Sequence, residues 1–333
     1  MIDSERIGRA IRTLRLKAGY TQKQLAEKLF VSDMAVSKWE RGKSTPDPAA
    51  LQQLAVLLDM DVDGLLDGSA TYLDDRWHGV LLLSAEGLSA DTLLYDKPLI
   101  DYQLSYFLLA GVRDVLVACP AGEEQSIRSR FRDGEALGIS LRFTRPEKLT
   151  AENVLGAQPD SSDIMFVSEP FFLYGVDLSR FLQRAMQHKS PVVDLASVVG
   201  RSGATLREGF SHYRYRPLPL HFLQARFLAA CGADTSLRDL PRLAEEKKRL
   251  RMEPMDKGFI LSALRTVGDG ERVAGLVKSI QELGDYLIYC PPEIAWRRGM
   301  LDRSRMRQEA ARFPEYREYL LGMISDEANA DRL

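Results

Sequence analysis

The chain has 333 residues, 45% of them apolar, and a formal net charge of −2. This length allows a small helical domain and one larger core, so two domains are the expected count. The balanced charge excludes a protein that coats nucleic acid over its whole surface. The chain has three isolated cysteines, and their spacing indicates neither a metal site nor a disulfide framework. No leader or long apolar stretch is found, so we expect a cytoplasmic protein without membrane association.

Residues 21–47 contain the signals for two short capped helices joined by a tight turn. Thr21, with Gln24 three positions later, can satisfy the free amides at the start of the first helix. Ser32 is placed to cap the second helix. Two capped helices at this spacing indicate a helix-turn-helix, whose second helix enters the major groove of DNA.

Three further helices are expected around this pair. One covers about 4–18, one begins at Asp47-Pro48, and a short one covers 62–66. The segment resembles the lambda-repressor-like (XRE) family of bacterial regulators, because Trp39-Glu40-Arg41-Gly42-Lys43 and Asp61-Val62-Asp63-Gly64-Leu65-Leu66 match that family's habitual endings. The resemblance implies a DNA-binding domain. The alternative interpretation is a helical bundle used for protein contact.

The second helix of the pair should present an outward face to DNA. Met34 lies off the stripe of Val36 and Trp39, so we expect its side chain to point outward. The resemblance makes Asp33, Met34 and Lys38 the base-reading positions; Asp33 can accept from a cytosine or adenine amino group. The other residues expected to contact DNA, at phosphates or the groove edge, are Gln22, Lys23, Ser32, Ser37, Arg41, Lys43 and Ser44.

A different pattern follows a polar linker at 69–77. Short aliphatic runs now alternate with helical stretches, which indicates a parallel sheet with crossover helices. Strands are expected at 79–83, 114–118, 139–143 and 164–167, and helices at 100–110, 123–131 and 177–187. The predicted fold is therefore multidomain, with an all-α domain over 1–68 and an α/β doubly wound domain over 78–326.

Three stretches of the larger domain resemble bacterial glucose-1-phosphate thymidylyltransferase. They are Leu94-Tyr95-Asp96-Lys97-Pro98-Leu99-Ile100-Asp101, Phe172-Leu173-Tyr174-Gly175-Val176-Asp177 and Cys290-Pro291-Pro292-Glu293-Ile294. The resemblance runs with gaps from about 79 to 324. It implies the nucleotide-diphospho-sugar transferase fold of the sugar nucleotidyltransferases.

Several groups that this family uses for catalysis are replaced. Residues 84–92 stand where the family has a glycine-rich loop with cations, and carry none. Ser168-Glu169-Pro170 and Ala263 occupy the two metal positions. We therefore expect a catalytically inactive domain with no catalytic residues, no metal site and no need for magnesium. The candidate residues of a remnant ligand cleft are Ser84, Glu86, Gly87, Lys97, Lys148 and Glu169.

An active enzyme built from Lys97, Glu169 and Asp177 is the alternative, although we expect Lys97 to face solvent and Asp177 to cap a helix. The four histidines show no ligand spacing or paired nucleophile, so they are assigned no chemistry. Arg214 and Arg216, interleaved with tyrosines, indicate an edge strand with exposed arginines.

These patterns together predict a transcriptional regulator that binds a double-stranded DNA operator as a homodimer or higher homo-oligomer. Its larger domain is expected to sense a nucleotide or nucleotide-sugar, to dimerise, or both. Assembly is expected through the C-terminal helices over about 291–324, whose apolar residues are Ile294, Trp296, Met300, Leu301, Tyr316, Tyr319, Leu320 and Met323. The alternatives are a constitutive repressor that only oligomerises or docks on a true nucleotidyltransferase, and a bifunctional DNA-binding nucleotidyltransferase.

Overall fold

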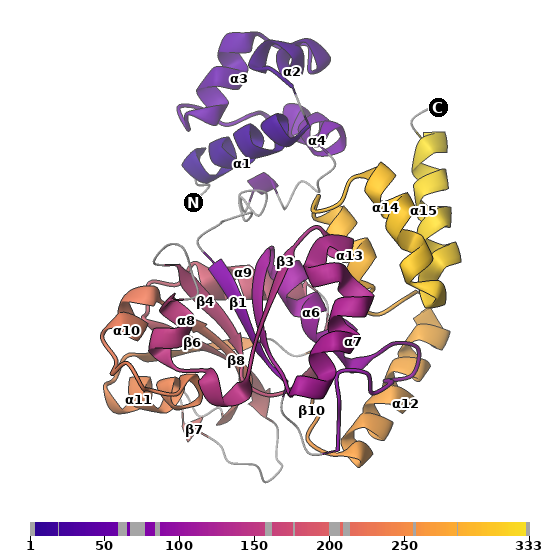
Figure 1. Cartoon of the computed structure of the whole chain (residues 1–333). Helices are drawn as coiled ribbons and strands as arrows, with labels where there is room; N and C mark the ends of the chain where they lie inside the picture. Colours follow the sequence, from indigo (N-terminus) through magenta and orange to yellow (C-terminus); the bar gives the residue numbers. More distant parts are fainter. Residues whose placement is uncertain are drawn as a thin grey trace. The chain divides into compact units, whose positions relative to one another are not determined.

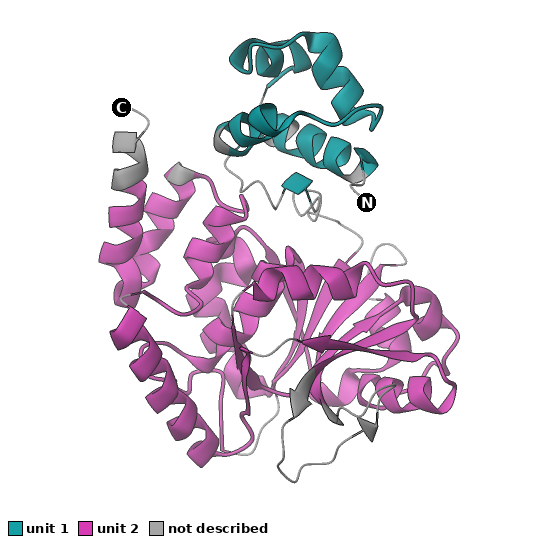
Figure 2. Ribbon diagram, turned by 180° about the vertical axis from the view of Figure 1, so that it is seen from behind, with its two compact units in different colours: residues 1–74 teal, residues 75–333 magenta. Residues whose placement is uncertain are grey.

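The structure, a computed structural model, divides the chain into two compact units, Met1–Asp74 and Asp75–Leu333 (Figure 2). It describes residues 4–18, 20–58, 65–66, 77–83, 87–156, 162–175, 177–199, 207–208, 214–255, 258–284 and 286–330. Most of the linker expected over 69–77 lies outside these ranges, as do residues 62–64 of the expected short helix. No helix in the described ranges is both long and apolar enough to cross a membrane.

The N-terminal unit is a bundle of helices, as the sequence predicted (Figure 1). Its described helices are α1 (Ser4–Lys17), α2 (Gln22–Lys28), α3 (Asp33–Glu40) and α4 (Pro48–Leu57). The expected caps are present: the Thr21 hydroxyl accepts from the Gln24 amide at 3.1 Å, and the Gln24 side chain accepts from the Thr21 amide at 2.8 Å. The hydroxyl of Ser32 caps α3 and the carboxylate of Asp47 caps α4.

Apolar side chains from all four helices form the core of this unit, and α1 packs tightly on α3. Leu25 and Val36 are fully buried in it, together with Ile11 and Leu54. Gly8 sets the distance between α1 and α3, because a Cβ added there would lie 2.2 Å from the carbonyl oxygen of Trp39. The helix-turn-helix is therefore held against α1 by a contact that no larger residue permits.

The larger unit is built on a mixed sheet in the order β3-β2-β1-β4-β8-β6-β9, with β7 beside β8. Its strands are β1 (Trp77–Leu82), β2 (Asp114–Ala118), β3 (Ser140–Thr144), β4 (Asp163–Val167), β6 (Val192–Val199), β7 (Arg207–Glu208), β8 (Arg214–Leu223) and β9 (Leu250–Met255). The expected parallel pairing holds for β1 to β4, whereas β8 runs antiparallel to both of its neighbours. A separate ribbon pairs β5 (Phe171–Tyr174) with β10 (Ile260–Ala263).

Helices cover both faces of the sheet, which confirms the doubly wound α/β class (Figure 1). One face packs α6 (Leu99–Ala110), α7 (Ala121–Phe131), α9 (Leu178–Met186) and α13 (Pro291–Arg297), and the other packs α8 (Ala151–Gly156), α10 (Ala225–Ala229) and α11 (Leu240–Glu246). The remaining helices are α12 (Val267–Gly284), α14 (Arg303–Glu309) and α15 (Arg317–Ala330), with 3-10 turns at Arg132–Leu137, Pro146–Lys148, Leu237–Asp239, Ala310–Arg312 and Pro314–Tyr316.

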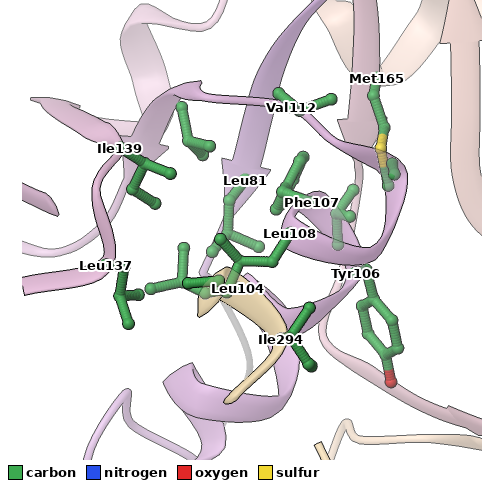
Figure 3. Close-up of a cluster of buried hydrophobic side chains, with 14 of the residues drawn as sticks. Leu81, Leu104, Tyr106, Phe107, Leu108, Val112, Leu137, Ile139, Met165 and Ile294 are labelled. Carbon is green, nitrogen blue, oxygen red and sulfur yellow. The ribbon is translucent and has the colours of Figure 1, made fainter. Parts of the chain in front are cut away.

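Alternation along the strands produces the two cores. Leu81 and Met165 point to the face covered by α6, where they meet Leu104, Phe107 and Ile294 (Figure 3). The residues next to them along β1 and β4 point to the opposite face, which is covered by α8, α10 and α11. Strands β1, β2 and β4 are thus buried on both sides, which is why they appear as mostly aliphatic runs in the sequence.

The C-terminal helices contribute much of their apolar surface to this same core. Of the eight apolar residues expected at an assembly surface, Ile294, Met300, Leu301, Tyr316 and Leu320 are buried within the chain itself, and Trp296, Tyr319 and Met323 are half-buried. The hydroxyl of Tyr316 donates to the fully buried Asp101 of α6, which also accepts two hydrogen bonds from Arg130 at 2.7 and 2.6 Å. The 3-10 turn that precedes α15 is thereby fixed to α6.

Candidate functional site

Helix α3 presents a polar face to solvent. Its buried side is formed by Val36 and Trp39, which leaves Asp33, Met34 and Lys38 exposed on the opposite side. Met34 keeps 65% of its surface accessible, an unusual exposure for a large apolar side chain. Since the cap at Ser32 fixes where the helix begins, these three side chains project together from its first turns, as base readout in the major groove requires.

The residues expected at DNA phosphates are mostly free to reach them. Lys23, Arg41, Lys43 and Ser44 are exposed, as is Ser32, whereas Ser37 is half-buried. Gln22 is the exception, because its amide donates to Glu40 at 2.7 Å. The side-chain amide of Gln22 is therefore engaged in a hydrogen bond within the bundle.

Two features of this unit were missed in the sequence. Arg15 of α1 pairs with Glu40, both nearly buried, and also donates to the carbonyl of Tyr20 at 2.7 Å. Phe30, in the turn between α2 and α3, is 93% exposed and has a positive φ of 53°. A phenylalanine in this conformation is strained and buries nothing in its own chain, so Phe30 adds an apolar projection beside the recognition helix.

The strand order of the larger unit reverses at β1. From β1 the chain runs outward through β2 and β3, and then returns to β4 on the other side of β1. The carboxyl ends of β1 and β4 lie side by side, with Leu81 opposite Val167. Ligands of open α/β sheets bind at this position, and Glu169 follows directly after β4.

A cavity of about 330 Å³ lies beyond this end of β4. Arg265 donates to both carboxylate oxygens of Glu169, at 3.1 and 2.5 Å, and this pairing raises the pKa of Arg265. Arg216 also lines the cavity, and within the described part of the chain its buried Nε has no hydrogen-bond partner. The complete lining is Glu169, Phe171, Arg216, Pro217, Pro219, Leu261, Ala263 and Arg265. Two guanidinium groups against one carboxylate leave the cavity with a net positive charge.

The edge-strand interpretation of Arg214 and Arg216 was wrong. Strand β8 lies inside the sheet between β4 and β6, and Arg216 is half-buried. Because β8 extends beyond the end of β4, the first residues of β8 form a wall of the cavity. This placement depends on strand order, which the local sequence does not encode.

The candidate cleft residues do not all meet. Ser84 and Glu86 lie outside the described residues, and of the four candidates that are described only Glu169 lines the cavity. Gly87 lies beside Val267 at the start of α12, and Lys148 is exposed after β3. The structure therefore separates Lys148 and Gly87 from the lining.

Lys97 differs most from expectation, since its side chain is fully buried rather than exposed to solvent. Its Nζ lies 2.6 Å from Asp96, 3.3 Å from the Tyr102 hydroxyl and 3.4 Å from Gln281. Burial lowers the pKa of Lys97, although Asp96 acts in the opposite direction. Asp177 precedes α9 as expected, but its side chain makes no capping hydrogen bond.

The magnesium site implied by the family resemblance does not fit the side chains at this cavity. Ala263 offers no ligand atom, and Glu169 is already bound by Arg265. Among the described residues, no group of three histidine, cysteine or acidic side chains could hold a metal ion.

A hydrogen-bonded chain of three polar side chains was also missed in the sequence. The Ser168 hydroxyl lies 2.9 Å from Nε2 of His221, and Nδ1 of His221 lies 2.7 Å from Asp194. The assignment of no chemistry to the histidines overlooked this contact, because the three residues come from β6, β8 and the end of β4.

Comparisons with known proteins agree with both units. Residues 11–65 match the family described as helix-turn-helix. The chain is 26% identical over 267 residues to the glucose-1-phosphate thymidylyltransferase of Neisseria meningitidis, which covers 72% of this chain and 93% of the relative. It is 24% identical to the enzyme of the same name from Mycolicibacterium smegmatis, with 72% and 93% coverage.

A solved structure shows the same fold. It is named for a glucose-1-phosphate thymidylyltransferase from Bacillus anthracis in complex with sucrose, and it superposes with a TM-score of 0.50 at 10% identity, covering 60% of this chain and 94% of the other.

The expectation that the chain is not an enzyme is contradicted by these relatives. They carry the name of an enzyme and align over most of the chain, at about a quarter identity, which points to an enzyme. Loss of individual family residues in the sequence was too weak a basis for excluding activity. The chain thus joins an XRE-type helix-turn-helix to a glucose-1-phosphate thymidylyltransferase-like region.

Proposed function

We propose that this protein is a sequence-specific transcriptional regulator whose larger unit binds a nucleotide or nucleotide-sugar. The observation that carries the DNA-binding part is the exposed face of α3, with Asp33, Met34 and Lys38 projecting from a capped helix. The helix-turn-helix match over residues 11–65 supports it. Recognition helices of this class work in pairs about one DNA turn apart, roughly 34 Å, so the proposal includes a homodimer.

Ligand binding is supported by the chemistry of the cavity beside Glu169. Arg216 offers an unpartnered Nε, and Arg265 can exchange its carboxylate partner for a phosphate. Arginine forks match phosphate oxygens in a bidentate geometry. A diphosphate bridging the two guanidinium groups needs no metal ion, so we expect binding without magnesium.

Thermal unfolding tests this binding directly. Purified protein is heated with nucleoside triphosphates, sugar-1-phosphates and nucleotide-sugars, each with and without magnesium. A ligand at a hundred times its dissociation constant should stabilise the protein by about 2.7 kcal/mol. The shift should shrink in Arg216→Ala and persist in Arg251→Ala, which removes an exposed arginine from β9. If no compound shifts the transition, the constitutive repressor that docks on a protein partner replaces this proposal.

The regulatory part requires that the ligand change DNA affinity. A ligand shifts an equilibrium only by its difference in affinity for the two states. Operator affinity is therefore measured by fluorescence anisotropy with and without a nucleotide-sugar that binds. A change of fivefold or more, at the usual scale of allosteric coupling, supports sensing. Equal affinities under saturation would show that binding and regulation are separate.

The second candidate is a bifunctional protein that also transfers a nucleotide. It is favoured by the relatives named glucose-1-phosphate thymidylyltransferase, whose own length is covered to 93%. Its signature is pyrophosphate release from thymidine triphosphate and glucose 1-phosphate, measured with and without magnesium. Glu169→Gln, which removes the carboxylate from the cavity, should abolish that release. Release that is unchanged in this variant would place the chemistry elsewhere.

A further inference from the structure

Ser168, His221 and Asp194 are arranged as a nucleophile, a base and a residue that orients the base. The distances are 2.9 Å from the serine oxygen to Nε2 and 2.7 Å from Nδ1 to the carboxylate. We infer that these residues form a catalytic site, which hydrolyses a carboxylic ester that carries an anionic group. The inference does not depend on nucleotide binding or on regulation.

The hydrogen-bond directions follow from the chemistry of the groups. A carboxylate can only accept, so the hydrogen between His221 and Asp194 sits on Nδ1 of the imidazole. A neutral imidazole then has its lone pair on Nε2, which must accept from the Ser168 hydroxyl. This tautomer draws the proton away from the serine oxygen, as general-base activation requires.

The three side chains differ in solvent exposure, as a catalytic site requires a sheltered base and an accessible nucleophile. Asp194 is 1% exposed and His221 is 7% exposed, whereas Ser168 is half-buried and accessible. His221 lies directly opposite both Asp194 on β6 and Phe166 on β4, so the sheet holds its ring from both sides. The base is therefore sheltered from solvent, while the nucleophile keeps part of its surface accessible.

Ser168 also adjoins the positively charged cavity. Its amide donates to the carbonyl of Pro219 at 3.0 Å, and both Pro219 and the next residue, Glu169, line the cavity. In the part of the chain that the structure describes, no backbone hydrogen bond uses the amide of Glu169. The amide after a nucleophile is a common donor to a developing oxyanion. Arg216, which lines the same cavity, can bind the anionic group of the ester.

The reaction balances with water as the only co-reactant. The Ser168 oxygen attacks the carbonyl carbon while its proton moves to Nε2 of His221, and the carbon–oxygen bond to the alcohol breaks as that proton passes to the leaving oxygen. Water then attacks the acyl-serine, giving its proton to Nε2, and the serine leaves with that proton restored. One ester and one water become one acid and one alcohol.

Labelling with a fluorophosphonate tests the site in the full-length protein. The serine attacks phosphorus and fluoride leaves, so a mass increase on the peptide containing Ser168 is expected. Ser168→Ala should abolish the label, and Ser129→Ala, which removes an exposed serine from α7, should not change it. His221→Ala should lower the rates of labelling and of 4-nitrophenyl acetate hydrolysis by about a thousandfold.

The pH profile separates catalysis from a purely structural hydrogen-bond chain. In the unaltered protein the labelling rate should fall on acidification, because only a neutral imidazole can accept the serine proton. Asp194→Asn, which tests a positioning residue, should reduce the rate and alter that profile. No label on Ser168, or a rate that is independent of pH and of His221, would overturn the inference.

Discussion

Arg15 in helix α1 holds Glu40 at the end of α3 through two hydrogen bonds, Nε to Oε1 at 2.5 Å and Nη2 to Oε2 at 3.1 Å. The guanidinium and carboxylate side chains are 8% and 2% exposed, so each depends on the other for its charge to be tolerated inside the bundle. Gln22 completes the arrangement by donating to Glu40. The pair therefore locks the supporting helix to the recognition helix.

Removing Arg15 should destabilise the N-terminal unit by about 3–5 kcal/mol, because it leaves a buried carboxylate without its cation. The measurement is amide hydrogen exchange over residues 4–58 in the full chain, which reports this unit separately. Arg9→Ala is the matched control on the same helix, since its pair with Glu5 is exposed and should matter little. Equal effects of the two variants would contradict the role of the buried pair.

Lys38→Ala and Lys43→Ala should change DNA binding in different ways. Lys38 projects from α3, so its loss should relax base preference at one position by about 1–3 kcal/mol. Lys43 follows the helix, so its loss should weaken all sequences alike and reduce the slope of affinity against salt by about one. Titration of operator and random duplexes at several salt concentrations separates these effects, with Lys278→Ala as the charge control. Unchanged affinity in both variants would reject the proposed docking.

Gly8→Ala should destabilise the helix-turn-helix, although alanine ordinarily favours helices. The added Cβ would meet the carbonyl oxygen of Trp39, and relief requires α1 and α3 to separate at a cost of about 1–3 kcal/mol. Gly122→Ala in α7 is the comparison, since nothing lies within 4 Å of its added Cβ and a gain of about 0.5–1 kcal/mol is expected. Amide hydrogen exchange, measured separately in each unit, reports both changes in stability. A gain at Gly8 would refute the close-contact argument.

Lys97 should make stability depend on pH in the alkaline range. Burial lowers its pKa in the folded state below the ordinary value of 10.5, despite the neighbouring Asp96, Asp101 and Cys290. Between those two values the unfolded chain binds more protons, so stability should rise with pH across that window. Urea unfolding at a series of alkaline pH values below 10.5 should show this slope in the unaltered protein and in Lys278→Met, and a smaller slope in Lys97→Met. Identical slopes in all three proteins would contradict the assignment of this pH dependence to Lys97.

Local signals allowed much of the fold to be predicted. Thr21, Ser32 and Asp47 cap their helices through atoms at most three residues away, so the sequence contains the whole interaction. Strands β1, β2 and β4 were visible because burial on both faces makes them mostly aliphatic. The XRE and thymidylyltransferase-like resemblances were confirmed for the same reason, since their motifs are contiguous.

The contacts that define the candidate sites in the larger unit are long-range, and these were not predicted. His221 reaches Ser168 across 53 residues and Asp194 across 27, through a reversed strand whose position no local pattern reveals. Arg265 reaches Glu169 across 96 residues. Lys97 was expected to face solvent because it falls at a turn before a helix, whereas its Nζ lies within hydrogen-bond distance of Gln281 from α12. Tertiary packing, rather than the local sequence, determines which partners these side chains contact.

The bond between Asp101 and Tyr316 joins residues that are 215 positions apart, whereas helices α1 to α4 are complete by Leu57. On a ribosome adding roughly 5–20 residues each second, the tyrosine emerges about 10–40 s after its aspartate partner. The helix-turn-helix can therefore form long before Tyr316 is available to Asp101. Until then, a nascent chain carries a folded helix-turn-helix attached to a larger unit in which Asp101 lacks one of its hydrogen-bond donors.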